Sequence, residues 1–127
     1  GIEAMGIPLA AALCLSSGKP LVIGRKRQYG LPGEVSIDQS TGYSKGEIFL
    51  NDIDAGARVL IVDDVVSTGG TLLPILRALD GSGAIVQDCW IVFEKGEGMN
   101  KVRAAGDWPL NSLVRIEMQG DKIVLLD

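Results

Sequence analysis

The stretch that decides the fold runs from residue 59 to residue 71 and reads Val59-Leu-Ile-Val-Asp63-Asp64-Val-Val-Ser67-Thr68-Gly69-Gly70-Thr71. It begins as a continuous apolar run, of the kind that is buried on both faces of a parallel sheet. Two carboxylates, a turn of small residues and the apolar residues of a helix follow. Ligands of open parallel sheets bind beyond the carboxyl ends of the strands, so this order predicts a binding site at that edge.

The turn at 67–71, called the phosphate loop below, has the chemistry of an anion cradle. Ser67, Thr68 and Thr71 supply hydroxyl groups. Gly69 and Gly70 let backbone N–H groups close around a phosphate at the positive end of the following helix. The loop lacks the Gly-Lys-Ser/Thr ending of a nucleoside-triphosphate loop, which argues against a triphosphate ligand.

The neighbouring carboxylates of Asp63 and Asp64 would repel a phosphate unless they faced another part of the ligand. Sugar hydroxyls donate hydrogen bonds to carboxylates, so a phosphorylated ribose satisfies both halves of the motif. A plainer alternative is a strand that ends in two aspartates, with Ser67 or Thr68 capping the next helix. A response-regulator-type acidic pocket is another, but it needs a further distant aspartate and leaves the glycines unexplained.

Strands and helices alternate around this stretch, which predicts an α/β domain with a mainly parallel sheet, flanking helices and right-handed crossovers. Helices are expected at 8–15, 71–79 and 100–105. Strands are expected at 20–24, 47–50, 58–62, 85–93, 113–118 and 122–126. Residues 28–45 are rich in Gly, Pro, Ser, Thr and Tyr and predict a long loop, in which the alternation of Val35, Ile37 and Gln39 allows a short hairpin arm.

Composition narrows the class of protein. The chain has 127 residues, of which 46% are hydrophobic, enough for the core of one domain. Its 12 basic and 16 acidic residues give a net charge of −4, the wrong sign for a domain that coats a nucleic-acid backbone. Cys14 and Cys89 predict neither a disulfide framework nor a zinc site, so a reducing cytoplasm is expected. The longest apolar stretch, 7–15, is too short to span a bilayer.

Two further segments fit a ligand with more than one phosphate. Gly1 and Gly6 bracket a tight turn, called the first loop below, whose backbone N–H groups could hold a second phosphate. The alternative is an ordinary strand-to-helix turn. Arg25, Lys26 and Arg27 concentrate positive charge on an acidic protein, where a pyrophosphate would gain from it. The alternative for this triplet is a solvated edge.

Taken together, these motifs make the chain resemble the type I phosphoribosyltransferase family. Its signature is a hydrophobic strand, two acidic residues and a Thr-Gly-Gly-Thr-like loop that binds 5-phosphoribosyl-1-pyrophosphate (PRPP). The resemblance covers essentially all of 1–127, read as one phosphoribosyltransferase domain. The segments at 1–8, 25–34 and 41–46 are most similar to the archaeal hypoxanthine/guanine phosphoribosyltransferases, which are adenine-phosphoribosyltransferase-like in build. They are also similar to xanthine phosphoribosyltransferases.

The resemblance implies a role for each segment. Asp63 and Asp64 would be the catalytic pair that fixes the ribose diol, with Mg²⁺ held only indirectly through ribose hydroxyls or water. The 5′-phosphate would bind Ser67, Thr68, Gly69, Gly70 and Thr71. The pyrophosphate would bind Glu3, Ala4, Met5, Gly6, Arg25, Lys26 and Arg27. A flexible loop over 27–45, with Gly42 among its hinge residues, would close over the site and bring in Tyr29, Glu34 and Lys45. Lys95 would bind a purine carbonyl.

The implied activity is purine salvage, in which the phosphoribosyl group of PRPP passes to hypoxanthine or guanine to give IMP or GMP and pyrophosphate. Ser67 stands where many six-oxopurine enzymes carry an aspartate that accepts the purine proton, so the general base is unassigned, with Glu34 a candidate. Met5 replaces a basic residue that many relatives carry in the first loop. Xanthine, adenine and orotate stay open as acceptors. A non-catalytic PRPP-sensing domain of a transcription regulator is the alternative outside enzymes.

The resemblance also bears on partners and on the chain's extent. Family members are commonly dimers, so we expect a cytoplasmic homodimer that acts on small molecules and binds nucleic acid only if fused to a DNA-binding segment. In the family a strand precedes the loop that Gly1 already occupies here. We therefore expect the sequence to lack an N-terminal segment of its domain.

Overall fold

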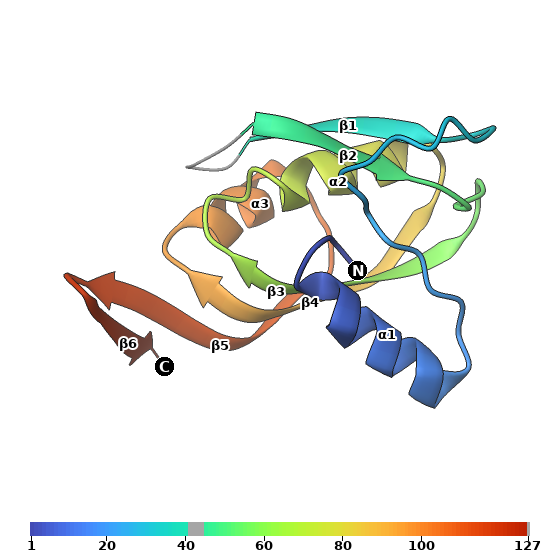
Figure 1. Cartoon of the computed structure of the whole chain (residues 1–127). Coiled ribbons are helices and arrows are strands. Elements are labelled where there is room, and N and C mark those ends of the chain that lie inside the picture. Colours follow the sequence, from blue (N-terminus) through green and yellow to red (C-terminus); the bar gives the residue numbers. More distant parts are fainter. Residues whose placement is uncertain (41–44, 127) are drawn as a thin grey trace.

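The structure is a computed structural model that describes residues 1–40 and 45–126. Its elements are α1 (Gly6–Ser17), β1 (Val35–Ser40), β2 (Lys45–Leu50), β3 (Arg58–Val66), α2 (Leu72–Gly81), β4 (Ile85–Lys95), α3 (Gly98–Ala105), β5 (Leu110–Gln119) and β6 (Lys122–Leu126). One sheet has the order β3-β4-β5-β6, and β1 and β2 form a separate hairpin. In Figure 1, α1 lies on one side of the four-stranded sheet, and α2, α3 and the hairpin lie on the other.

The four-stranded sheet confirms the predicted α/β architecture. Strands β3, β4 and β5 run parallel, and β6 returns antiparallel to β5. The apolar run of β3 was expected to end at Val62, yet the strand continues to Val66. The reason is that β4 also continues, so Val65 pairs with Phe93 and Val66 with Glu94. The two aspartates consequently lie within the strand near its carboxyl end.

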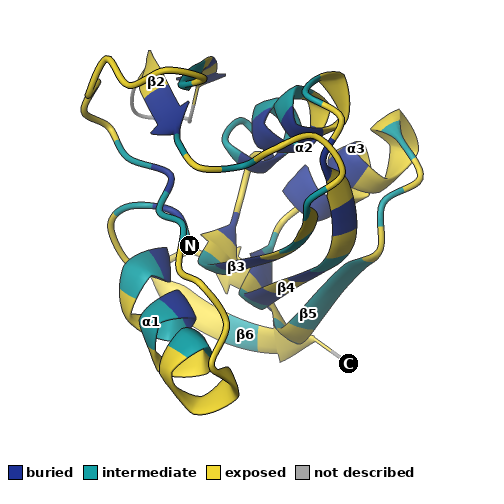
Figure 2. Cartoon of the chain, turned by 90° about the vertical axis from the view of Figure 1, so that its right-hand side faces the viewer, coloured by how far each residue is buried: buried dark blue, intermediate teal, exposed yellow. Residues whose placement is uncertain are grey.

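The core forms between this sheet and α2, α3 and the hairpin. Four residues of α2 at helical spacing are buried: Leu72, Ile75, Leu76 and Leu79. They pack with buried residues of the other elements, which include Ile37, Ile48, Ile61, Cys89, Ile91, Met99 and Val102. Figure 2 shows the buried face of α2 turned toward the strands. This packing fixes the strand ends that carry the polar motif.

The hairpin arm that the sequence allowed within the long loop is present as β1 and β2. The two strands pair antiparallel from Val35 with Leu50 to Ser40 with Lys45. Its inward positions, Ile37 and Gln39, are buried. Residues 41–44 of the expected flexible loop over 27–45, Gly42 included, lie outside the described residues.

The strand predicted at 20–24 is wrong. Gly24 makes a single parallel bridge to Ile2, with the Gly24 N–H donating to the Gly1 carbonyl at 2.8 Å and the Glu3 N–H donating to the Gly24 carbonyl at 2.9 Å. The pairing does not grow into a strand because its partner turns away after Glu3 and enters α1 at Gly6. Leu21 accordingly stays 40% exposed.

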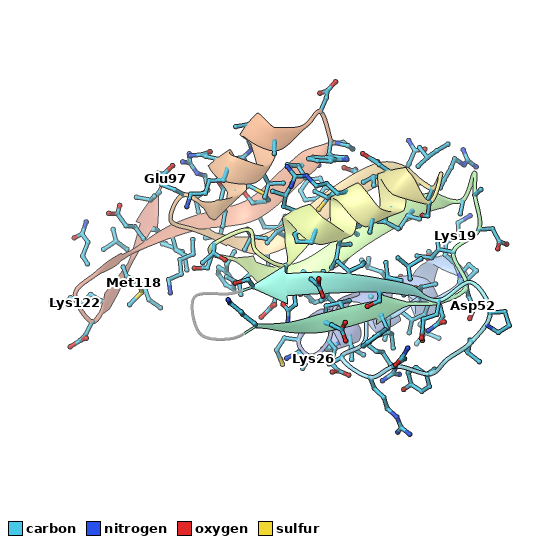
Figure 3. All side chains as sticks on the ribbon, turned by 90° about the horizontal axis from the view of Figure 1, so that it is seen from above. Lys19, Lys26, Asp52, Glu97, Met118 and Lys122 are labelled. Atoms are coloured by element: carbon cyan, nitrogen blue, oxygen red, sulfur yellow. The ribbon has the colours of Figure 1, made fainter. Side chains whose placement is uncertain are left out.

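The hairpin formed by β5 and β6 extends away from the helices (Figure 1). No residue of β6 is buried. Figure 3 labels Met118 and Lys122 on this extension. Among the described residues, no helix is long and apolar enough to cross a membrane.

Candidate functional site

Asp63 and Asp64 lie side by side near the carboxyl end of β3, each half-buried. The N–H of Asp64 donates to Asp63 Oδ1 at 2.9 Å. Burial is the largest influence on the Asp63 carboxyl and raises its pKa to about 7, although the hydrogen bond from the Asp64 backbone opposes the rise. The Asp63 carboxyl therefore gains or loses its charge with small changes of pH near neutrality. A nearby cation or nearby hydroxyl donors would favour its ionised form.

A cavity of about 220 Å³ opens beside this acidic pair. It is lined by Ile2, Glu3, Ala4, Met5, Lys26, Gln39, Asp63, Asp64, Val65 and Thr71. The structure thus brings the first loop, one residue of the basic triplet, both carboxylates and the last hydroxyl of the phosphate loop to one place. These groups combine carboxylate acceptors with cationic and hydroxyl donors, as a phosphorylated sugar requires.

Gly6 lets the first loop approach the acidic pair. A Cβ atom at this position would lie 2.7 Å from Asp63 Oδ1 and 3.1 Å from the Val62 carbonyl oxygen. The Gly6 N–H donates to the Ile2 carbonyl at 3.0 Å, and the peptide bond that precedes Ala4 is cis. None of the described hydrogen bonds uses the N–H groups of Ile2, Ala4 or Met5, and those of Ala4 and Met5 lie in the turn that lines the cavity.

The three residues of the basic triplet differ in their partners. Arg25 lies 3.9 Å from Glu3 in an ion pair, and its guanidinium carbon also lies 6.0 Å from the centre of the Tyr29 ring. Arg27 lies over the ring of Tyr29, with its guanidinium carbon 5.5 Å from the ring centre. Lys26, labelled in Figure 3, is the member of the triplet that lines the cavity.

The hairpin arm is docked on the phosphate loop. Thr71 Oγ1 donates to Gln39 Oε1 at 2.6 Å, and the N–H of Ser40 donates to the Gly70 carbonyl at 3.1 Å. Our sequence reasoning did not propose Gln39 as a site residue. The signal was its inward position in an alternating segment, because a buried amide needs a polar partner.

A second cavity, of about 720 Å³, is lined by residues of the hairpin arm, the phosphate loop, α2 and α3. This cavity, and not the smaller one, is lined by Thr68, Gly69, Gly70 and Lys45. Neither Asp63 nor Asp64 lines it. We assign the candidate site to the smaller cavity because both carboxylates, Lys26 and the first loop converge there. Ser67 lines neither cavity.

Six other predicted site residues also line neither cavity: Gly6, Arg25, Arg27, Tyr29, Glu34 and Lys95. Tyr29 is 46% exposed. Glu34 accepts hydrogen bonds from the side chain of Asn51 at 3.0 Å and from the N–H groups of Tyr29 and Gly30. The bond from Asn51 is the main cause of a lowered pKa at Glu34. Lys95 ends β4, where it pairs with Ile116 of β5.

Comparison with known proteins fits this geometry. The model of the phosphoribosyl transferase domain matches residues 1–114. Hypoxanthine/guanine phosphoribosyltransferases from Ferroglobus placidus and Methanothrix thermoacetophila are 52% and 49% identical over 99% and 96% of this chain, respectively. The adenine phosphoribosyltransferase of Rhodothermus marinus superposes on 91% of the chain with a TM-score of 0.76 and 26% identity. The chain therefore belongs to the phosphoribosyltransferase family.

The chain matches only part of the length of each relative. The chain covers 67% of the Ferroglobus placidus protein, 64% of the Methanothrix thermoacetophila protein and 66% of the Rhodothermus marinus structure. Adenine phosphoribosyltransferase of Saccharomyces cerevisiae, solved with an imino-altritol bisphosphate and adenine, gives a TM-score of 0.73 at 28% identity, with 89% of this chain and 64% of that one covered. These neighbours confirm the expected type I fold.

Proposed function

We propose that this protein transfers the 5-phosphoribosyl group of PRPP to hypoxanthine or guanine, giving IMP or GMP and pyrophosphate. The observation that carries the proposal is the convergence of Asp63, Asp64, Lys26, Thr71 and the first loop on one cavity. The names of the archaeal relatives support hypoxanthine and guanine as the acceptors.

The reaction forms a bond between a purine nitrogen and the anomeric carbon of the ribose, and breaks the bond from that carbon to pyrophosphate. Positive charge develops on the sugar as the leaving group departs, so carboxylates close to the ring stabilise the transition state. Asp63 and Asp64 fill this role and accept hydrogen bonds from the ribose hydroxyls. Most of the remaining work is positioning. The phosphate loop would hold the 5′-phosphate, with Thr71 at the smaller cavity and Thr68, Gly69 and Gly70 at the larger one; Gln39 lines both cavities.

The leaving pyrophosphate needs positive charge and N–H donors. Lys26 and the N–H groups of Ala4 and Met5 supply them at the cavity, and Arg25 and Arg27 add charge nearby. Lys95 would reach the purine carbonyl from the end of β4. Closure of the 27–45 loop would exclude water, because hydrolysis of the activated sugar competes with transfer.

Mg²⁺ would neutralise charge on the leaving pyrophosphate. In proteins it commonly keeps several waters and binds through one or two carboxylates together with substrate phosphates. Within residues 1–40 and 45–126, no group of three or more acidic, His or Cys side chains could hold a metal by itself. The residues therefore fit an ion held mainly by the substrate, with Asp63 and Asp64 assisting through ribose hydroxyls or water.

We propose in addition a cytoplasmic homodimer that acts on small molecules and binds no nucleic acid through this domain. The net charge of −4 supports the last point. The thiols of Cys14 and Cys89 are free, which suits a reducing compartment.

The decisive assay uses purified full-length protein with Mg²⁺, PRPP and each of hypoxanthine, guanine, xanthine, adenine and orotate. We expect nucleotide and pyrophosphate to form fastest with hypoxanthine or guanine. Preference for another base would correct the acceptor. Tight binding of PRPP without turnover on any base would indicate a non-catalytic PRPP-sensing domain and not an enzyme.

The site assignment is tested with the double variant Asp63→Asn and Asp64→Asn. Loss of both charges removes the stabilisation of the developing cation, so we expect kcat to fall by roughly 10³-fold or more, with an unchanged circular dichroism spectrum. The matched control is Asp52→Asn with Asp54→Asn, two exposed aspartates outside both cavities. Full activity in the Asp63 and Asp64 variant would refute the assignment.

A further inference from the structure

The phosphate loop rests on the first two turns of α3. Gly98 approaches the loop so closely that a Cβ atom there would overlap the carbonyl group of Ser67. On the loop side, a Cβ at Gly69 would lie 3.0 Å from the Gly98 carbonyl oxygen and 3.0 Å from Val102 Cγ2. With no spare space between them, α3 restricts the positions that the loop can take.

Helix α3 is itself tied to the sheet by one buried charge. The side chain of Glu94, the next-to-last residue of β4, is 2% exposed. Arg103 of α3 donates to both of its carboxylate oxygens, at 2.8 and 2.9 Å. Ser112 of β5 donates to Glu94 Oε2 at 2.7 Å, and Arg115 Nε lies 3.8 Å from Oε1. The carboxylate thus joins β4, β5 and α3.

The bidentate geometry makes this link directional. A planar guanidinium that uses two N–H groups on one carboxylate fixes both distance and orientation, which a lysine ammonium cannot do. Asn100, one turn earlier on α3, accepts a further bond from Arg103 at 2.9 Å and holds the side chain in place. The core residues Met99 and Val102 add packing beneath the helix but no such directional bond.

We infer that the Glu94–Arg103 pair is a positioning element that sets the phosphate loop through α3 and thereby controls affinity for the 5′-phosphate of the substrate. Neither residue lines either cavity, and we assign neither of them a contact with the substrate. The inference rests on the proposed function for the identity of the substrate, while the mechanical link from Glu94 to the loop is independent of it.

The 5′-phosphate takes no part in bond making, and we expect the phosphate loop to hold it in the ground state as well as in the transition state. Loss of such binding raises KM and leaves kcat nearly unchanged. A displaced loop therefore has a kinetic signature that general loss of folded protein lacks, since unfolding lowers the apparent kcat for both substrates without changing KM.

The test compares Arg103→Met, Arg103→Lys and the control Arg58→Met, an exposed arginine at the amino end of β3. We expect Arg103→Met to raise KM for PRPP about tenfold, with less than a threefold change in kcat or in KM for the purine. Arg103→Lys should recover part of the loss because it keeps the charge but not the two-bond geometry. The control should match the wild type. An unchanged KM for PRPP in folded Arg103→Met would overturn the inference.

A second experiment keeps the inference testable if an Arg103 variant does not fold or if the wild-type protein shows no turnover. Glu94→Gln keeps the shape and one acceptor oxygen, and we expect the same selective rise in KM for PRPP. Calorimetric titration with ribose 5-phosphate measures the phosphate site without the transfer reaction, and we expect Kd to rise about tenfold in Glu94→Gln. If the wild type binds ribose 5-phosphate but shows no turnover, only the proposed function is refuted. If wild type and variant bind ribose 5-phosphate equally well, only the inference is refuted.

Discussion

Asp63 lies where burial opposes its charge. The carboxyl group is half-buried beside a second acid, and its pKa rises to about 7 mainly through loss of solvent. An ordinary aspartate in the unfolded chain titrates near pH 3.9. Between these two values the native state binds a proton that the unfolded state has lost. The contribution of Asp63 to stability is therefore favourable at low pH and falls as the pH rises through 7.

Asp63→Asn should stabilise the folded protein at high pH. We expect the melting temperature at pH 8 to rise by several degrees, at roughly 3–5 °C per kcal/mol for a domain of this size, with little change at pH 4, where the carboxyl is protonated in the native state. Differential scanning calorimetry at both pH values measures this, with the exposed Asp54→Asn as control. An equal shift at pH 4 and pH 8 would contradict the assigned cause.

The residue scale also shows what sequence can and cannot predict. Asp63, Asp64 and the phosphate loop lie close together in the chain, so a candidate site at this strand end could be predicted from the residues alone. Arg103 and Glu94 are only nine positions apart, yet their pairing depends on how α3 packs, which no local pattern specifies. Lys26 was predicted only as one of three equivalent cations, because adjacent side chains diverge in ways that spacing does not reveal.

At the scale of elements, the hairpin arm is attached to the phosphate loop by polar bonds and to the core by apolar ones. Ile37 and Ile48 are buried in the core, and Gln39 and Ser40 bond to the loop. The alternation that indicated β1 from sequence holds because one face of the hairpin is covered by α2. The predicted strand at 20–24 lacks such a covered face and an extended partner, and β-type residues alone do not form a strand.

Gln39→Leu should loosen the arm without unfolding the domain. It removes the acceptor for the Thr71 hydroxyl, a loss of about 1–2 kcal/mol. We expect faster hydrogen exchange at the Ser40 amide, which bonds to Gly70, measured by nuclear magnetic resonance. Ser36→Ala, on the exposed face of β1, is the matched control and should leave the Ser40 amide unchanged. An unaltered rate in Gln39→Leu would show that packing alone holds the arm.

On the scale of the whole molecule, the sheet is unevenly supported. Strand β3 is covered by α1 and β4 by α2 and α3. The β5–β6 hairpin extends beyond the helices (Figure 1), and Leu113, Ile123 and Leu125 are 65–71% exposed. The packing that stabilises the sheet therefore decreases from its centre toward the edge formed by β6. The sequence indicated every strand of this sheet but not this gradient, because burial is decided by which layers cover which strand.

Hydrogen exchange should follow that gradient. Amides of β6 are expected to exchange at least roughly tenfold faster than those at the centre of β4, since β6 has no buried residue and pairs only with β5. Exchange followed by mass spectrometry after proteolysis gives the order directly. The amides of β3 provide an internal control for a strand covered by a helix. Equal protection of β6 and β4 would indicate that the edge strand unfolds only with the whole domain.

Gly6 and Gly98 have a consequence for anyone who compares or redesigns such proteins. Each is a spacer: the absent side chain sets how far the acidic pair stands from the first loop, or the phosphate loop from α3. Selection for activity would hold both positions as firmly as a catalytic group, although neither contributes chemistry. Gly81, with open space around it, has no such constraint. A comparison of relatives at these two positions would therefore report clearances and not only reactive groups, and a redesign of the proposed base specificity has to preserve those clearances.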